Sequence, residues 1–133
     1  MKIVFDTNVI LSSFLTEGIA HKIFHNSLIH HEIYISAFII SEINRILKKK
    51  FSVNETDIEE FNSFIKSYLT TAKPTNNIPD ICRDKNDNQI LQLAEFVSAD
   101  LIISGDKDLL TLKTYSGTAI ISPREFYTTY IIL

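Results

Sequence analysis

The hydrophobic and polar positions of the chain follow two periodicities. Short continuous apolar runs are typical of buried parallel strands, and apolar residues at three- and four-residue spacing are typical of amphipathic helices. Strands are predicted at residues 3–5, 32–36, 101–104 and 119–121, with a weak edge strand near 72–75. Helices are predicted at about 9–14, 19–30, 37–50 and 86–97, with a short one after 106 and a final one after 122.

Polar residues at the predicted helix starts support these boundaries. Ser36 is predicted to cap the helix over 37–50. Residues 56–59, Thr-Asp-Ile-Glu, have the pattern of a capping box, so a helix is predicted from Thr56 to about Leu69. Ser122 followed by Pro123 predicts the start of the final helix. The alternation of strands and helices predicts an α/β fold with a mainly parallel sheet covered on both faces.

Composition narrows the class of protein. The 133 residues are 45% hydrophobic, which is expected of a single globular domain over 1–133. No apolar run approaches the roughly 20 residues of a membrane helix, and no signal peptide is recognised. The one cysteine permits no internal disulfide, which is compatible with the cytoplasm. A formal charge of −3 is unusual for a passive nucleic-acid-binding module but not for a nuclease with clustered carboxylates.

Four acidic residues are expected near one edge of the sheet. Asp6 follows the first strand, and Asp106 follows the strand over 101–104 after a glycine turn. Parallel strands of an open α/β sheet end at the edge where ligands bind. Asp87 comes just after a predicted helix start, and Glu42 lies early in a helix among apolar neighbours. Each residue alone has an ordinary explanation as a turn, cap or surface residue, but together they predict an acidic cluster.

Clustered carboxylates repel one another, and a hard divalent cation removes that conflict. Mg²⁺ and Mn²⁺ prefer oxygen ligands, and sites that bind them hydrolyse phosphodiesters without a protein nucleophile. Other chemistries fit less well, because the chain has neither a Gly-x-Gly-x-x-Gly motif nor a P-loop. The acids therefore favour metal-dependent phosphodiester hydrolysis.

The motifs that carry these acids resemble those of the PIN-domain nucleases. They are residues 3–8 (Ile-Val-Phe-Asp-Thr-Asn), 41–42 (Ser-Glu), 83–88 (Arg-Asp-Lys-Asn-Asp-Asn), 104–110 (Ser-Gly-Asp-Lys-Asp-Leu-Leu) and 121–126 (Ile-Ser-Pro-Arg-Glu-Phe). The resemblance covers essentially the whole chain. It implies a three-layer α/β/α sandwich and a Mg²⁺- or Mn²⁺-dependent ribonuclease, often the toxin of a type II toxin–antitoxin pair of the VapC-like class.

The resemblance also implies roles for individual residues. The catalytic and metal-binding acids would be Asp6, Glu42, Asp87 and Asp106. Supporting residues would be Asn8, Asp84, Ser104 and Asp108. Candidates for RNA contacts are Arg45, Arg83, Lys85 and Lys107. The implied partners are an RNA substrate, a small antitoxin protein and a second copy of the chain in a homodimer.

Two alternatives remain open from the sequence. One is a PIN nuclease that processes RNA or cleaves structured DNA without an antitoxin; a small reading frame beside the gene would favour the toxin instead. The other is a non-catalytic interaction module, which would fail to bind Mn²⁺. The sequence does not distinguish one bound ion from two.

Overall fold

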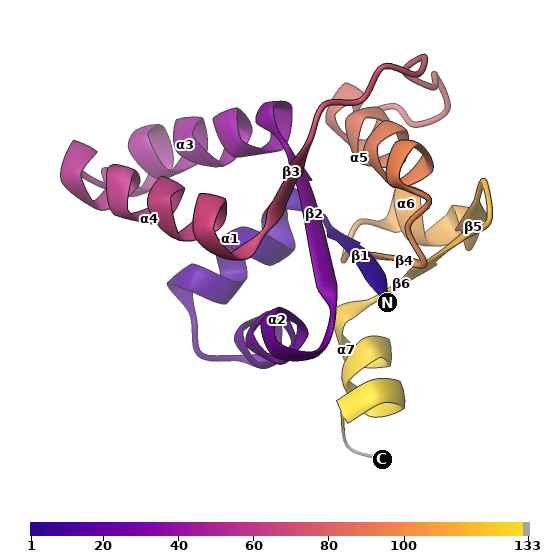
Figure 1. The fold of residues 1–133 in the computed structure, drawn as a ribbon, viewed down its shortest axis with the longest axis horizontal. Helices are drawn as coiled ribbons and strands as arrows, with labels where there is room; N and C mark the ends of the chain where they lie inside the picture. The colour runs from indigo at the N-terminus through magenta and orange to yellow at the C-terminus, as the bar shows by residue number, and fades with distance from the viewer. Residues whose placement is uncertain (132–133) are drawn as a thin grey trace.

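The computed structural model describes residues 1–131 and contains a six-stranded sheet in the order β3-β2-β1-β4-β6-β5 (Figure 1). The strands are β1 (Lys2–Phe5), β2 (Glu32–Ser36), β3 (Thr70–Ala72), β4 (Leu101–Ile103), β5 (Thr114–Tyr115) and β6 (Thr118–Ile121). All neighbouring strands are parallel except β5, which pairs antiparallel with β6. The predicted mainly parallel sheet is confirmed.

The two central strands are the most buried part of the sheet. In the register of β1 and β4, Ile3 lies opposite Leu101 and Phe5 lies opposite Ile103. These four side chains are at most 5% exposed. Strands buried on both faces need continuous apolar runs, which explains why β1 and β4 were recognisable from the sequence.

Helices cover both faces of the sheet. They are α1 (Thr7–Leu15), α2 (Ile19–His30), α3 (Ala37–Phe51), α4 (Glu55–Tyr68), α5 (Lys85–Val97), α6 (Lys107–Leu112) and α7 (Pro123–Phe126), the last continued by the π-helical turn η1 (Tyr127–Ile131). Figure 1 shows α1 to α4 on one side of the sheet and α5 and α6 on the other. The predicted three-layer α/β/α fold is therefore confirmed. None of the helices in residues 1–131 is long and apolar enough to cross a membrane.

The strand order reverses beside β1, and this reversal positions the site. The chain moves outward from β1 through β2 to β3 and then returns to place β4 on the other side of β1. The connections that follow β1 and β4 therefore leave the same edge of the sheet in opposite directions. Open α/β sheets form their ligand crevice at such a switch point.

Two local predictions were wrong, and one strand was missed. Asn54, not Thr56, caps α4, because its Oδ1 accepts a hydrogen bond from the Asp57 amide at 2.8 Å. The edge strand β3 begins at Thr70 instead of near residue 72. The hairpin strand β5 was not predicted, because two residues are too few to show a period; its turn to β6 passes through Gly117 at φ +81°.

Candidate metal centre

Asp6 lies at the switch point, directly after β1. Its amide donates to the Ile103 carbonyl at 2.9 Å, which ties the end of β1 to the end of β4. The Asp6 side chain is only 6% exposed, and its Oδ2 accepts a hydrogen bond of 2.7 Å from Ser104 Oγ. Ser104 Oγ also accepts from the Asp106 amide at 2.9 Å. One buried hydroxyl thus connects the two strand-end acids, which supports the predicted role of Ser104.

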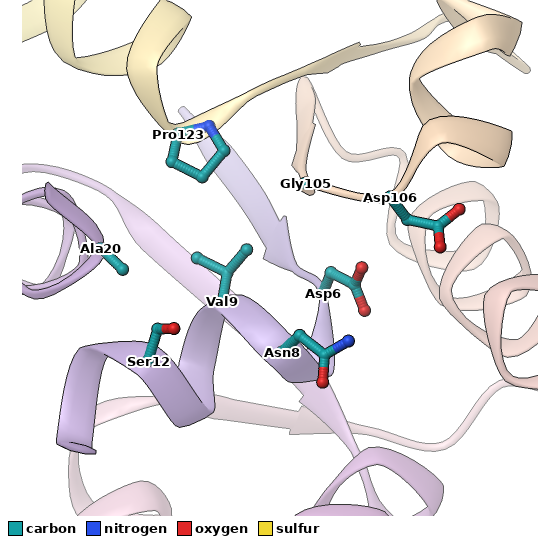
Figure 2. Close-up of a pocket in the computed structure, with 8 residues that line it drawn as sticks. All are labelled: Asp6, Asn8, Val9, Ser12, Ala20, Gly105, Asp106 and Pro123. Carbon is teal, nitrogen blue, oxygen red and sulfur yellow. The ribbon is translucent and has the colours of Figure 1, made fainter. Parts of the chain in front are cut away.

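Asp106 occupies the N-cap of α6, directly beyond β4. Its Oδ1 accepts from the amides of Asp108 at 2.9 Å and Leu109 at 3.3 Å. Capping fixes the side chain and leaves Oδ2 for other partners. Figure 2 shows Asp6 and Asp106 lining one hollow together with Asn8, which lies at the start of α1. Asp6 and Asp106 both stand at the N-cap position of a helix that follows a central strand.

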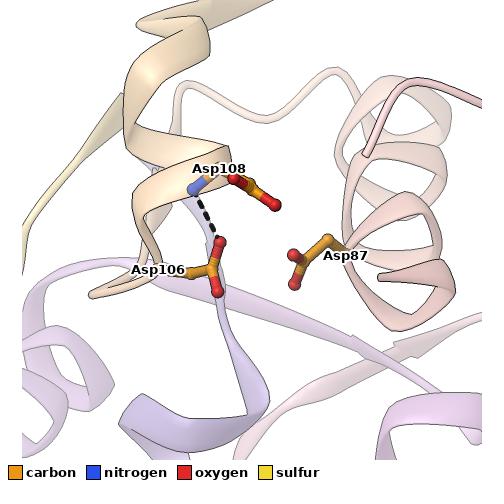
Figure 3. A group of neighbouring side chains, drawn as sticks. All are labelled: Asp87, Asp106 and Asp108. Atoms are coloured by element: carbon orange, nitrogen blue, oxygen red, sulfur yellow. Dashed lines mark hydrogen bonds between the residues drawn. The ribbon is translucent and has the colours of Figure 1, made fainter. Parts of the chain in front are cut away.

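Asp87 reaches the same place from α5. One carboxylate oxygen each from Asp87, Asp106 and Asp108 lie within 4.8 Å of one another. Figure 3 shows the Asp87 side chain pointing from α5 toward the two acids at the start of α6. Asp84 caps α5 by accepting from the Asn86 amide at 2.9 Å, so it orients the helix that carries Asp87. The structure therefore brings Asp6, Asp87, Asp106 and Asp108 to one edge of the sheet.

The protonation of these acids reflects their crowding. Burial, followed by the charges of Asp106, Asp6 and Asp84, raises the pKa of Asp87 to about 7. Burial also raises the pKa of Asp6; the Ser104 hydroxyl opposes this effect and the charge of Asp106 adds to it. Neighbouring buried carboxylates repel one another when all of them are ionised, and this repulsion raises their pKa values. The site therefore favours a proton or a cation.

The donor set fits a hard divalent cation. Asp87 Oδ2 is buried and has no hydrogen-bond partner among residues 1–131, which is a costly state for a carboxylate oxygen. Mg²⁺ and Mn²⁺ take oxygen ligands, and Mg²⁺ is usually held by one or two carboxylates together with water. Asp87, Asp106 and Asp108 have oxygens close enough together to share such an ion, and Asp6 lies beside Asp106 in the adjoining hollow.

Glu42 is the predicted acid that the described contacts do not join to this cluster. It lies in α3, and its Oε2 accepts from Arg45 Nε at 3.0 Å and Nη2 at 2.9 Å. The Glu42 side chain is 18% exposed. Its place one turn into α3 is the predicted one, but the group of mutually close carboxylates is formed by Asp87, Asp106 and Asp108.

The predicted RNA-contact residues differ in their surroundings. Arg83 donates to both oxygens of Asp108, from Nε at 3.1 Å and from Nη2 at 2.9 Å. Arg45 is engaged by Glu42, whereas Lys85 and Lys107 are exposed first residues of α5 and α6. Lys85 and Lys107 lie on the helices next to the acids, whereas Arg83 lies in the segment before α5.

The sequence did not reveal two residues beside Asp6, Ser12 and Pro123, or the pairing of Arg83 with Asp108. Ser12 and Pro123 line the hollow beside Asp6, and Pro123 follows β6, whose end meets the same sheet edge. Knowing the strand order would have revealed Pro123, but the order is not readable from the sequence. Arg83 was chosen for its charge, and its pairing with Asp108 across 25 residues had no sequence signal.

The strand order and acidic centre define an α/β protein with an acidic crevice at its switch point. A family model of the PIN domain matches residues 2–108, and the chain therefore belongs to the PIN-domain family. It is 33% identical over 122 residues to the uncharacterized protein MJ1680 of Methanocaldococcus jannaschii, covering 85% of this chain and 76% of that protein. This membership supports a hydrolase that acts on phosphodiester bonds.

Two solved structures have a similar fold. One is a chain of VapBC2 from Rickettsia felis, whose structure was solved with a DNA fragment from the VapBC2 promoter. It superposes with a TM-score of 0.69 and 14% identity, covering 92% of this chain and 98% of that chain. A chain of FitAB bound to an IR36 DNA fragment gives a TM-score of 0.61 and 18% identity, covering 91% and 94%. At these identities the likeness supports the fold alone.

Proposed function

We propose that the protein is a metal-dependent endoribonuclease that hydrolyses RNA phosphodiester bonds. The observation that carries this proposal is the buried Oδ2 of Asp87, which has no partner among residues 1–131, on a side chain that points toward Asp106 and Asp108 (Figure 3). A carboxylate kept in that state without a proton or cation would be destabilising. Membership of a nuclease family supports the choice of substrate bond.

The acids take different parts in this proposal. Asp6 and Asp87 would be the main ligands of Mg²⁺ or Mn²⁺, and Asp106 would hold a second ion or orient the attacking water. A bound ion would lower the pKa of that water and neutralise charge on the leaving oxygen. Glu42 would join Asp106 only after its ion pair with Arg45 is broken. The Arg45 side chain is 52% exposed, which leaves it room to move away. Lys85, Lys107 and Arg83 would contact the RNA phosphates.

A cleavage assay on a varied RNA pool tests the proposal. Purified protein should cut RNA in Mn²⁺ or Mg²⁺ and stop in EDTA. Asp87→Asn and Asp6→Asn should each lower the rate by about 100-fold or more, because each removes a direct metal ligand. Asp80→Asn is the matched control, since Asp80 is an exposed acid outside the cluster, and it should leave cleavage unchanged.

Three results would contradict the proposal. Cleavage that persists in EDTA or in Asp87→Asn would remove the acids from the mechanism. Absence of both cleavage and Mn²⁺ binding in the unmodified protein would favour the non-catalytic interaction module. Binding of Mn²⁺ with cleavage of structured DNA but not RNA would favour the processing nuclease.

We further propose that the protein is a toxin held in check by a small antitoxin. The superposed chains come from VapBC2 and FitAB, whose names describe two-component complexes. A groove between α1 and α3 offers a surface for such a partner; it is lined by Asn8, Leu11, Ser12, Leu15, Thr16, Ile46, Lys50 and Phe51. It shares Asn8 and Ser12 with the hollow beside Asp6, so a peptide bound there would reach the acidic site.

The charge around the groove favours an acidic amphipathic segment. Lys50, in the last turn of α3, lines the groove and gives it a positive charge in a chain whose net charge is −3. Phe51 is 52% exposed and Leu15 is 42% exposed, so both offer apolar surface to a partner. In the same cleavage assay, the product of a small reading frame beside the gene should suppress cutting. An uninhibited enzyme in its presence would favour the processing nuclease.

A further inference from the structure

Asn88 is a buried amide that neither the acidic motif nor the proposed reaction explains. It follows Asp87 in α5 and is 3% exposed. Its Oδ1 accepts from the amides of Ile81 at 3.2 Å and Cys82 at 2.9 Å, and its Nδ2 donates to the Cys82 carbonyl at 3.1 Å. The amide oxygen and the amide nitrogen of Asn88 therefore both bond to the backbone of residues 81–82. This pattern requires a donor and an acceptor on the same side chain.

The segment held by Asn88 leads directly to Arg83. The Arg83 guanidinium makes the two parallel bonds to Asp108, yet its side chain is 89% exposed and that of Asp108 is 32% exposed. An exposed ion pair holds its partners weakly by itself. The buried clamp at Cys82 holds the backbone immediately before Arg83, from which the guanidinium extends to Asp108.

These contacts form a continuous link between the two helices that supply the acids. The link runs from Asn88 on α5 through Cys82 and Arg83 to Asp108 on α6. Asp108 lies two residues after Asp106, whose Oδ1 accepts from the Asp108 amide. The link thus begins beside Asp87 and ends beside Asp106, and it holds together two groups that repel each other.

We infer that Asn88 is a positioning residue for the metal centre, holding the Arg83–Asp108 pair so that the acids of α5 and α6 face one another before the ion binds. This inference rests on the proposed function, because it assumes that Asp87 and Asp106 bind the ion. Asn88 itself need not touch the ion. Its contribution is to lower the cost of assembling the ligands, as partners of metal ligands do elsewhere.

Gln92 provides a matched control on the same helix. It lies one turn beyond Asn88, is 8% exposed, and donates from Nε2 to the Asn76 carbonyl at 2.8 Å. Asn88→Ala and Gln92→Ala therefore each remove a buried amide clamp between α5 and the preceding loop. Only the Asn88 clamp connects to Arg83.

Isothermal titration of the metal-free full chain with Mn²⁺ tests the inference. Asn88→Ala should weaken Mn²⁺ binding about 10-fold or more, in the range found for partners of metal ligands. Gln92→Ala should leave the Mn²⁺ affinity within about twofold of the unmodified protein. Circular dichroism establishes that each variant is folded, and Asn88→Ser, which is expected to weaken binding similarly, replaces Asn88→Ala if the latter does not fold.

Cleavage measured against Mn²⁺ concentration separates positioning from general damage. For Asn88→Ala the half-maximal Mn²⁺ concentration should rise while the rate at saturating Mn²⁺ returns to that of the unmodified protein. Equal Mn²⁺ affinity in Asn88→Ala and the unmodified protein would overturn the inference, as would equal weakening by Gln92→Ala. Failure of the unmodified protein to bind Mn²⁺ would instead overturn the proposed function.

Discussion

Asp87 differs from an ordinary surface aspartate in the pH at which it loses its proton. Its pKa is raised to about 7, chiefly by burial and then by the charges of neighbouring acids. In the unfolded chain the same carboxyl titrates near 3.8. Because the folded state holds the proton more tightly, this residue favours folding at low pH, and the benefit is lost as pH rises from about 4 to about 7.

This linkage predicts a difference in thermal stability between the unmodified protein and Asp87→Asn. In EDTA, the Tm advantage of Asp87→Asn should grow between pH 5 and pH 8, because only the unmodified protein acquires an unpaired charge in that interval. Differential scanning calorimetry measures both proteins. His25 and His31 have lowered pKa values and act in the opposite direction, but they are present in both proteins and cancel in the comparison.

Addition of Mn²⁺ supplies the control for that experiment. A cation bound at the carboxylates should stabilise the unmodified protein at pH 8 and reduce or reverse the advantage of Asp87→Asn. A Tm difference between Asp87→Asn and the unmodified protein that is the same at pH 5 and pH 8 in EDTA would contradict a raised pKa of Asp87 in the folded protein.

At the scale of the elements, helix starts were predicted well wherever one residue could fill the cap. Ser36 caps α3 and Ser122 caps α7, as their sequence contexts indicated. The exception is α4, because Asn54 and Thr56 are both good caps and lie two residues apart. In the structure Asn54 is the N-cap, and Thr56 lies in the first helical turn.

A pair of alanine substitutions tests the start of α4. Asn54→Ala should reduce the free energy of unfolding by about 1 kcal/mol, because the Asp57 amide loses its acceptor. Thr56→Ala should change it by less than about 0.5 kcal/mol, as expected of an exposed residue with no capping role. Urea unfolding followed by circular dichroism measures the free energy of unfolding of both variants. A larger loss in Thr56→Ala than in Asn54→Ala would mean that Thr56 is the cap after all.

At the scale of the whole molecule, several large apolar side chains remain in contact with solvent. Ile29 is 79% exposed, Tyr68 is 64% exposed and Tyr130 is 44% exposed. These three residues lie on three different elements, α2, α4 and η1. The homodimer implied by the family resemblance stays a prediction: static light scattering at micromolar concentration should give twice the mass of one chain. The mass of a single chain would contradict it.

The sequence by itself determined the elements and the acids that follow them. The apolar runs of β1 and β4 are continuous because both faces of those strands are buried, so they are readable without a structure. Asp6 and Asp106 follow those runs directly, and parallel strands end at a common edge. Both the fold class and the meeting of Asp6 with Asp106 could therefore be predicted locally.

Only the tertiary structure decided which charged groups pair across the site. Asp108 meets Arg83 over 25 residues, and Ser104 meets Asp6 over 98. Such contacts depend on how segments far apart in the sequence lie against one another, and no local periodicity encodes that placement. The packed core sets the positions of these segments relative to one another, and a hydrogen bond forms only where its donor and acceptor are thereby brought to about 3 Å.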